Sequence, residues 1–280
     1  MSILTDLFRI PKFVAGLAIF LTIVALGLVG PLIYRVSPTD IVGPRYTPPS
    51  PSHPLGIDAL GRDVLAQLLY GIRGSLLVGA VAAGIALGLS LFLGTIAAVF
   101  GGLVDKVIMV ISEVFIIIPS LLLMMVLAAY LSPGARNIWL VGFVIGITSW
   151  GGWARGFRSR TMSILQSEFI KMAILSGASR VSIILRDIVP IISPYILASF
   201  AMLFTSAITA EVGLTIVGVG MTKDITLGLI LYIAQLYANI TQGIWWTVVP
   251  PTLVMILIYL SLYLVAISLD EYFSPKLGTA

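Results

Sequence analysis

The chain has 280 residues, of which 59% are hydrophobic and only 10% charged, so its composition excludes a water-soluble protein. Its formal net charge of +4 comes without a cluster of Lys and Arg, which excludes a nucleic-acid-binding surface. Because the chain has no cysteine and a single histidine, His53, we expect no disulfide, no thiol nucleophile, no metal site and no catalytic or cofactor-binding residue.

Long stretches without a charged residue recur six times along the chain. A helix needs roughly 20 apolar residues to cross the hydrocarbon core of a bilayer, whereas helices buried in a soluble core are shorter and alternate with charged faces. The sequence therefore predicts an all-α membrane protein, a bundle of about six transmembrane helices at residues 13–34, 75–101, 107–131, 138–154, 191–217 and 245–269.

The chain begins with residues 1–12, which precede an apolar run over 13–34. This run is longer than the apolar core of a secretory signal peptide and lacks a small-residue cleavage site, so we predict a retained first helix. Residues 35–74, rich in Pro and Gly, are predicted to form an external segment that ends in an amphipathic stretch near 61–73. We expect this segment to be held in place by ion pairs of Arg62, Asp63 and Arg73.

Glycines, prolines and tryptophans mark the later helices. The second helix carries two glycines at the GxxxG spacing that allows close helix packing, Gly84 and Gly88. Prolines are expected to kink the third and sixth helices, at Pro119 and at Pro250–Pro251. Residues before 245 are expected to form a short helix or re-entrant segment beside the bundle. Tryptophans are predicted as membrane-interface residues at Trp150, Trp153, Trp245 and Trp246.

The distribution of basic residues predicts the orientation. With the N-terminus inside, ten Lys and Arg residues fall on the inner side and six on the outer side. Most of the inner residues lie in the loop 155–190. The positive-inside rule therefore favours a cytoplasmic location for this loop and for both ends of the chain, residues 1–12 and 270–280.

The loop 155–190 has the pattern of two short helices. Ser163 with Gln166 resembles a capping box that starts the first helix, Gly177 can end it, Ser179 can cap the second helix, and Pro190 is expected to close it. Two interpretations remain open at this point. The loop is either an interfacial hairpin on the membrane or a docking site for a cytoplasmic partner, with Phe169 and Met172 as anchors.

This loop resembles the signature loop of permease subunits of ABC importers. The family pattern is Glu-Ala-Ala, three residues, Gly, and a Leu-Pro pair whose proline lies thirteen residues beyond the glycine. The corresponding positions are Lys171-Met172-Ala173, Gly177 and Val189-Pro190, so the spacing is kept while Lys171 replaces the glutamate. Glu168, one turn earlier, is the candidate to compensate for it.

Other segments extend the resemblance over nearly the whole chain. HPLGIDALGRDVLAQLLYGIRGSLLVG (53–79) is similar to the segment before the second helix in dipeptide, oligopeptide and nickel permeases of the second-subunit type. The match continues in FGGLVDKVIMVISEVFIIIPSLLL (100–123) and in Glu211 with Gly218 and Gly220.

The resemblance implies a transmembrane domain over 75–269 and several partners. A second permease subunit would complete the path, two ATPase subunits would bind the 155–190 loops, and an extracellular binding protein would deliver substrate. The residues implied in ATPase coupling are Glu168, Phe169, Lys171, Met172, Ala173, Ser176, Gly177, Ala178 and Ser179. The chain has no GxxxxGK[ST] motif, so ATP and Mg²⁺ would bind the partner subunits. The substrate class implied is short peptides, with oligosaccharides or nickel complexes as the alternatives.

Two acidic residues lie within predicted membrane helices, Glu113 and Glu211. Intramembrane carboxylates are costly and mark functional sites, so both are candidates to line the translocation path. The alternative is a structural pair or hydrogen bond between helices. A second class of protein, an ion-driven secondary transporter, would use one of them as its coupling acid. A membrane enzyme and a passive channel are less favoured, because no catalytic motif appears and a channel does not explain a docking loop.

Overall fold

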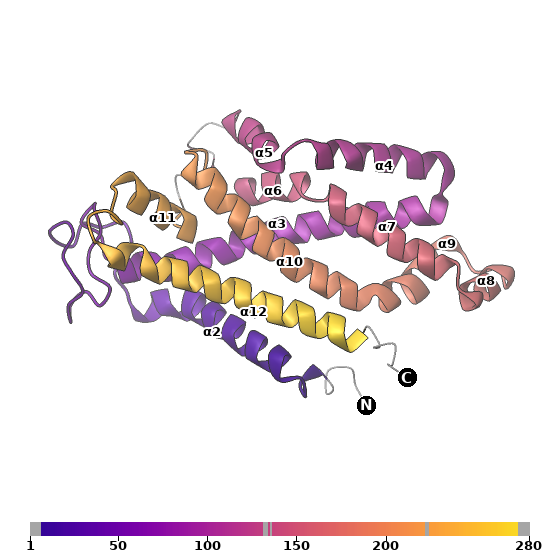
Figure 1. Cartoon of the computed structure of the whole chain (residues 1–280), viewed down its shortest axis with the longest axis horizontal. Coiled ribbons are helices and arrows are strands. Elements are labelled where there is room, and N and C mark those ends of the chain that lie inside the picture. Colours follow the sequence, from indigo (N-terminus) through magenta and orange to yellow (C-terminus); the bar gives the residue numbers. More distant parts are fainter. Residues whose placement is uncertain (1–6, 131–133, 135, 222–223, 274–280) are drawn as a thin grey trace.

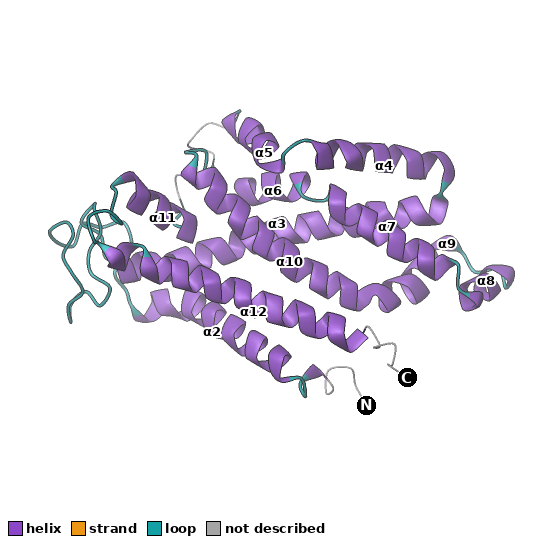
Figure 2. Ribbon diagram, in the orientation of Figure 1, coloured by secondary structure: helices purple, strands orange, loops and turns teal. Residues whose placement is uncertain are grey.

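The computed structural model describes residues 7–130, 134, 136–221 and 224–273. Its helices are α2 (Pro11–Ile33), α3 (Val64–Phe100), α4 (Gly102–Ile117), α5 (Ser120–Ala129), α6 (Ile138–Thr148), α7 (Gly151–Leu165), α8 (Glu168–Leu175), α9 (Arg180–Ile183), the π-helix η2 (Ile184–Ile188), α10 (Val189–Ile216), α11 (Leu227–Leu236), the 3₁₀ turn η3 (Trp245–Thr247) and α12 (Val249–Phe273). Among the described residues there is no strand, only an isolated bridge between Ile57 and Asp63 (Figure 2).

The fold is an all-helical membrane bundle, as predicted. In the described part of the chain, four helical segments are long and apolar enough to cross a membrane: Pro11–Ile33, Val64–Phe100, Arg180–Ile216 and Trp245–Tyr272. A fifth candidate is the pair formed by α4 and α5, which bends by 89° at a short break. The predicted helix 138–154 is divided between α6, which is short, and the first turn of α7.

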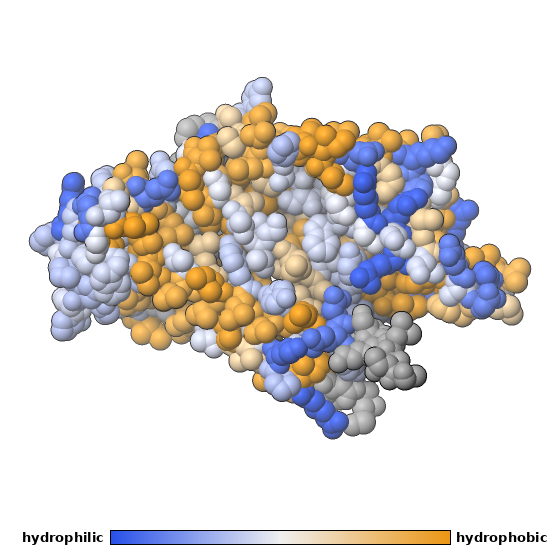
Figure 3. Space-filling model, in the orientation of Figure 1, coloured by the Kyte–Doolittle hydropathy of each residue, from blue (hydrophilic) through white to orange (hydrophobic). Residues whose placement is uncertain are grey.

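Helix α3 lies at the centre of the bundle, where it packs against α2, α6, α7 and α10, while α12 covers α2 and α10 (Figure 1). The main hydrophobic cluster joins Ile72 of α3, Phe204 of α10 and Leu262 of α12. The surface is mostly hydrophobic along the length of the bundle and hydrophilic at its two ends, as a protein surrounded by lipid requires (Figure 3).

The two ends of the bundle differ. Segment 34–63 lies at one end, and α8 projects from the other, beyond the rest of the helices (Figure 1). The start of α2 and the end of α12 lie together, joined by the ion pair of Lys12 with Glu271 at 2.8 Å. The predicted terminal segments 1–12 and 270–280, and the basic residues Lys223 and Lys276 of the charge count, fall partly or wholly outside the described residues.

The predicted start of the second helix is wrong, because α3 begins at Val64 instead of residue 75. Asp63 caps it, since its Oδ1 accepts a hydrogen bond of 2.8 Å from the backbone N–H of Ala66. The amphipathic stretch near 61–73 is therefore mostly the first turns of a continuous helix of 37 residues. Its polar side chains serve the hydrogen bonds of the preceding segment.

The prolines act in three different ways. Pro119 lies at the 89° break between α4 and α5, which confirms the predicted interruption. The kink predicted at Pro250–Pro251 is wrong, because both residues lie in the first turn of α12, where a missing N–H costs nothing. Pro190 does not end its helix either. The helix continues through η2, where the N–H of Val189 bonds to the carbonyl of Ile184 in the wider π pattern.

Two of the tryptophans predicted at the membrane interface make contacts within the chain, Trp150 as a buried residue and Trp246 as a half-buried one. Trp150 is 5% exposed and packs against Phe115. Trp246 donates from Nε1 to the carbonyl of Ile57 at 3.1 Å, which ties η3 to the segment before α3. The expected close packing at Gly84 and Gly88 is not made within this chain, because a Cβ at either position would meet nothing within 4 Å.

Candidate functional site

Helix α8 and the turn after it form the projecting end of the bundle. The predicted start of this helix at Ser163 is wrong, because α7 runs on to Leu165 and α8 begins at Glu168 after Ser167. The Ser163 and Gln166 pair therefore lies at the end of α7. Ser167 separates α7 from α8, because it adopts an extended conformation with ψ at 147°.

The turn at Gly177 ends α8 in a Schellman motif. The N–H of Gly177 bonds to the carbonyl of Ile174 at 3.0 Å, and the N–H of Ala178 bonds to the carbonyl of Ala173 at 3.1 Å. Gly177 has φ at +80°, a left-handed conformation that favours glycine. A Cβ there would meet nothing within 4 Å, so the demand comes from the backbone alone and the surface above the turn is open.

Ile170 fixes α8 to the bundle, and most of the other side chains of α8 are exposed. Ile170 is fully buried against Phe157 and Ile188. By contrast, Phe169 is 51% exposed and Met172 is 63% exposed. Large apolar side chains exposed together outside the bundle mark an interaction surface. The end of the turn continues into α9, whose N-cap is Ser179, as predicted: its Oγ accepts from the N–H of Ser182 at 3.2 Å.

The two charged residues of α8 pair with one another. Lys171 Nζ lies 2.8 Å from Glu168 Oε1, three residues apart on one face. Both side chains are largely exposed, so this ion pair contributes little to stability. Its effect is local neutrality, which leaves the neighbouring apolar side chains as the main feature of the surface.

Glu113 is placed on the outside of α4. Its Oε1 lies 3.4 Å from Arg155 Nη2 of α7, and its side chain is 56% exposed. A second ion pair, between Asp105 and Arg158, joins the same two helices. The Oγ of Ser112 donates to the carbonyl of Gly151 at 2.7 Å. The acid that the sequence marks as a path candidate thus belongs to a row of polar contacts between α4 and α7.

Glu211 is fully buried between α10 and the start of α11. Its Oε1 accepts from Thr226 Oγ1 at 2.7 Å and from Thr215 Oγ1 at 3.0 Å. A Cβ on Gly228 would approach its Oε2 to 2.8 Å, so this glycine leaves room for the carboxyl group. The structure therefore separates the two predicted path residues, with Glu113 on an exposed face and Glu211 inside a helix junction.

A polar cluster that the sequence did not predict closes the end opposite α8. Asp63 is fully buried, and its Oδ2 accepts from Tyr34 at 2.8 Å and lies 2.7 Å from His53 Nδ1. Burial, reinforced by the Asp63 carboxylate, raises the pKa of Tyr34 to about 12. Within the described ranges, no ion pair involves Arg62 or Arg73, so those expected pairs are wrong.

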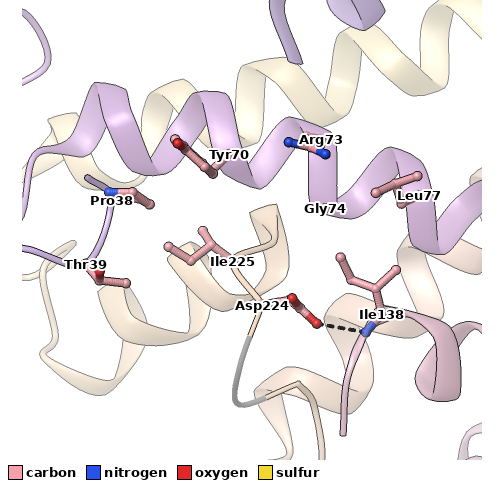
Figure 4. A pocket seen from close by; sticks show the side chains of 9 residues that line it. All are labelled: Pro38, Thr39, Tyr70, Arg73, Gly74, Leu77, Ile138, Asp224 and Ile225. Carbon is pink, nitrogen blue, oxygen red and sulfur yellow. Dashed lines mark hydrogen bonds between the residues drawn. The ribbon is translucent and has the colours of Figure 1, made fainter. Parts of the chain in front are cut away.

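Arg73 instead lines a cavity of about 290 Å³ at the same end of the bundle (Figure 4). Asp224 lines it too, and its Oδ2 accepts from the backbone N–H of Ile138 at 2.9 Å, at the start of α6. A larger groove of about 530 Å³ lies further along the bundle, between the α4–α5 break, the α6–α7 break and α10. No group of three or more potential metal ligands occurs in the part of the chain that the structure describes.

These features define a multi-pass helical membrane protein with an exposed apolar surface on α8 at one end. Residues 90–279 match the family described as the binding-protein-dependent transport system inner membrane component. The chain therefore belongs to this family, and it is a permease subunit of an ABC importer, as the sequence motifs predicted.

Several relatives match most of the chain. The oligopeptide transport system permease protein OppC of Mycobacterium tuberculosis is 32% identical over 215 residues, which cover 75% of this chain and 72% of the relative. The dipeptide transport system permease protein DppC of Bacillus subtilis is 30% identical over 267 residues, covering 94% and 81%. The di/tripeptide transport system permease protein DppC of Pseudomonas aeruginosa is 29% identical over 273 residues, covering 95% and 88%.

Proposed function

We propose that the chain forms half of the translocation path of an ATP-driven importer of short peptides, and that α8 with the Gly177 turn docks onto an ATPase subunit. The observation that carries the docking proposal is the pair of exposed apolar side chains on α8, Phe169 and Met172, beside the fully buried Ile170. The peptide substrate rests on the relatives, whose names describe oligopeptide, dipeptide and di/tripeptide transport.

The charge pattern of α8 favours a protein partner over a membrane surface. At 100° per residue, Glu168 falls between Met172 and Leu175 on the helix circumference, so a charged pair interrupts the apolar arc. A helix that lies on a membrane has separate apolar and polar faces, and a basic polar face strengthens its binding. With Lys171 paired to Glu168, the polar side of α8 is neutral, so α8 lacks the basic face that strengthens membrane binding.

The proposed orientation follows from the basic residues. The positive-inside rule gives α8, the start of α2 and the end of α12 a cytoplasmic location, and gives segment 34–63 an extracellular one. In this orientation α6 and the start of α7 together supply a sixth crossing, since the 11 residues of α6 are too short to span about 30 Å alone.

The proposed assembly has a second permease subunit, two ATPase subunits and an extracellular substrate-binding protein. ATP and Mg²⁺ would bind the ATPase subunits. The residues proposed to contact an ATPase lie on α8 and its turn, and all but the half-buried Ala173 are exposed: Glu168, Phe169, Lys171, Met172, Ala173, Ser176, Gly177, Ala178 and Ser179. Oligosaccharides and nickel complexes are the substrate alternatives that an uptake assay separates from peptides.

The test compares two sets of serine substitutions in the complete complex. Phe169→Ser with Met172→Ser removes both apolar anchors of α8, while Ile41→Ser removes a 77% exposed apolar side chain at the opposite end. Each anchor that fills a pocket is worth about 2 kcal/mol or more, so we expect ATPase affinity to fall by at least about thirtyfold per anchor. ATP-driven tripeptide uptake into proteoliposomes should fall with it.

The Ile41→Ser complex should retain its ATPase subunits and its uptake. The docking proposal fails if the double variant keeps ATPase subunits as tightly as the unmodified complex. It also fails if crosslinkers placed on α8 capture lipid headgroups and no polypeptide. Uptake by the chain alone, driven by an ion gradient without ATP, would favour a secondary transporter instead.

A further inference from the structure

The groove of about 530 Å³ lies where two interrupted helices meet a continuous one. Its walls come from the end of α4 and start of α5, from the end of α6 and start of α7, and from α10. Its lining includes the aromatic side chains of Phe115, Trp153 and Tyr195 and the hydroxyl groups of Ser149 and Ser206. On the face seen in Figure 3, a pale band of intermediate hydropathy crosses the hydrophobic surface where α4, α7 and α10 meet.

The groove lies deep within the lipid-facing part of the bundle. Ser206 is about 25 Å along α10 from the start of that helix, at 1.5 Å per residue, and the charge-free run around it extends from Asp187 to Glu211. Both helix interruptions, at Ile118–Pro119 and at Ser149–Trp150, leave backbone groups without a partner inside their own helices. At the second interruption the carbonyls of Trp150 and Gly151 accept from the side chains of Ser90 and Ser112. Irregular backbone at membrane depth is tolerated only where protein covers it or where it faces a water-filled cavity.

The polar groups of the groove carry no charge. Hydroxyl groups come from Ser120, Thr148, Ser149, Tyr195 and Ser206, of which Thr148 and Ser149 already donate to carbonyls of α6. Phe115 and Trp153 supply apolar wall. The nearest charged residues in the sequence, Glu113 and Arg155, are two positions outside the lining and pair with one another. Arg160 lies outside the lining too, with its guanidinium 3.8 Å from the centre of the Tyr195 ring. Such a surface offers hydrogen bonds to amide groups without selecting the sign of a side-chain charge.

We propose that this groove is this chain's share of the peptide path, and that its neutral hydroxyls and open backbone groups bind the main chain of the passing peptide. The inference rests on the proposed function, because it takes the substrate to be a peptide. A peptide main chain repeats one donor and one acceptor at every residue, so a neutral hydrogen-bonding groove accepts many sequences. A bilayer acyl chain, the competing occupant, would offer no hydrogen bond to the hydroxyls of Tyr195 and Ser206.

The absence of cysteine from the chain makes the test direct. Ser206→Cys places a thiol in the groove with little change in volume. Leu197→Cys is the matched control, because it lies nine residues earlier on the opposite face of α10 and is 56% exposed. A membrane-impermeant cationic methanethiosulfonate is added to the complete complex in proteoliposomes during ATP turnover, and the cysteine-free complex gives the background. The reagent needs water and a thiolate, so a lipid-facing thiol does not react.

We expect Ser206→Cys to react, tripeptide to slow the reaction, and uptake to fall by about tenfold or more, since a fixed charge and added bulk then occupy the path. Leu197→Cys should keep both its thiol and its uptake. The inference is overturned if Ser206→Cys stays unreactive, reacts without loss of uptake, or reacts only with a lipid-soluble maleimide. An unmodified complex that shows no ATP-driven peptide uptake would instead contradict the proposed function, so the two failures are distinguishable.

Discussion

Replacing Gly177 with alanine should disfavour the observed conformation of the turn with little effect on the stability of the rest of the fold. The left-handed conformation costs a non-glycine residue roughly 1–2 kcal/mol, and Gly177 adopts it with φ at +80°. Since an added Cβ meets nothing within 4 Å, no steric clash adds to that cost. The population of the observed turn should therefore fall by a factor of about 5–30 relative to competing turn conformations.

Gly218 provides a control with the same local geometry. It has φ at +83° and an open position for a Cβ. It ends α10 in the same way, because Gly218 N–H bonds to Thr215 at 2.9 Å and Val219 N–H bonds to Leu214 at 2.9 Å. Gly218→Ala should cost the same 1–2 kcal/mol, approximately, but at the end of the bundle far from α8.

The assay measures the apparent affinity of the permease complex for its ATPase subunits, beside thermal unfolding of both variants. A binding surface that is only fractionally populated lowers apparent affinity by that fraction. We expect Gly177→Ala to weaken ATPase binding by about 5–30-fold while Gly218→Ala leaves it unchanged, with similar unfolding temperatures. Equal effects of the two variants on ATPase binding would refute the reasoning.

Three further predictions concern polar contacts. Tyr34→Phe should remove the phenol that ionises near pH 12 in ultraviolet titration. The raised pKa of Tyr34 favours the protonated phenol in the folded chain. The contribution of Tyr34 to stability is therefore present below about pH 10 and lost as the pH rises to 12. Asp63→Asn should lower that midpoint. Arg158→Gln should destabilise the α4–α7 contact by about 1.5–3 kcal/mol in thermal unfolding, and adding Asp105→Asn should recover part of the loss. Glu211→Ala should cost about 1–3 kcal/mol by leaving the buried Thr226 hydroxyl without its acceptor, while the Thr215 hydroxyl keeps the backbone carbonyl of residue 211. Glu211→Gln keeps the accepting side-chain oxygen and should cost less; an equal loss would contradict this account.

The sequence predicted the membrane-spanning class and most helix positions because the hydrophobic requirement of a bilayer acts locally along the chain. The break at Pro119 was predictable for the same reason, because the missing N–H of a proline in mid-helix depends on that residue alone. The effects of Pro190 and Pro250 could not be predicted in that way. One residue lies next to a π turn and the other at a helix start, so the outcome depended on where the helix boundary fell.

The site was predictable where the backbone demands a residue type and unpredictable where distant segments meet. Gly177 was identified from the turn that it makes, and Phe169 and Met172 from their spacing on a short helix. The cluster around Asp63 was missed because His53 and Tyr34 reach it from different segments. No spacing rule records such contacts.

Helix α7 connects the proposed docking surface to the proposed peptide groove. Its first residues, Gly151 and Gly152, line the groove, and its last residue is separated from α8 only by Gln166 and Ser167. Two ion pairs and the hydrogen bond from Ser112 hold α4 against it, so α4 and α7 move together unless those contacts break. Because Ile170 of α8 packs against Phe157 of α7 across the break at Gln166–Ser167, we expect a displacement applied at α8 to reach both helix interruptions of the groove through α7. Interrupted helices change direction more easily than continuous ones. We therefore expect such a displacement to change the shape of the bundle at the groove.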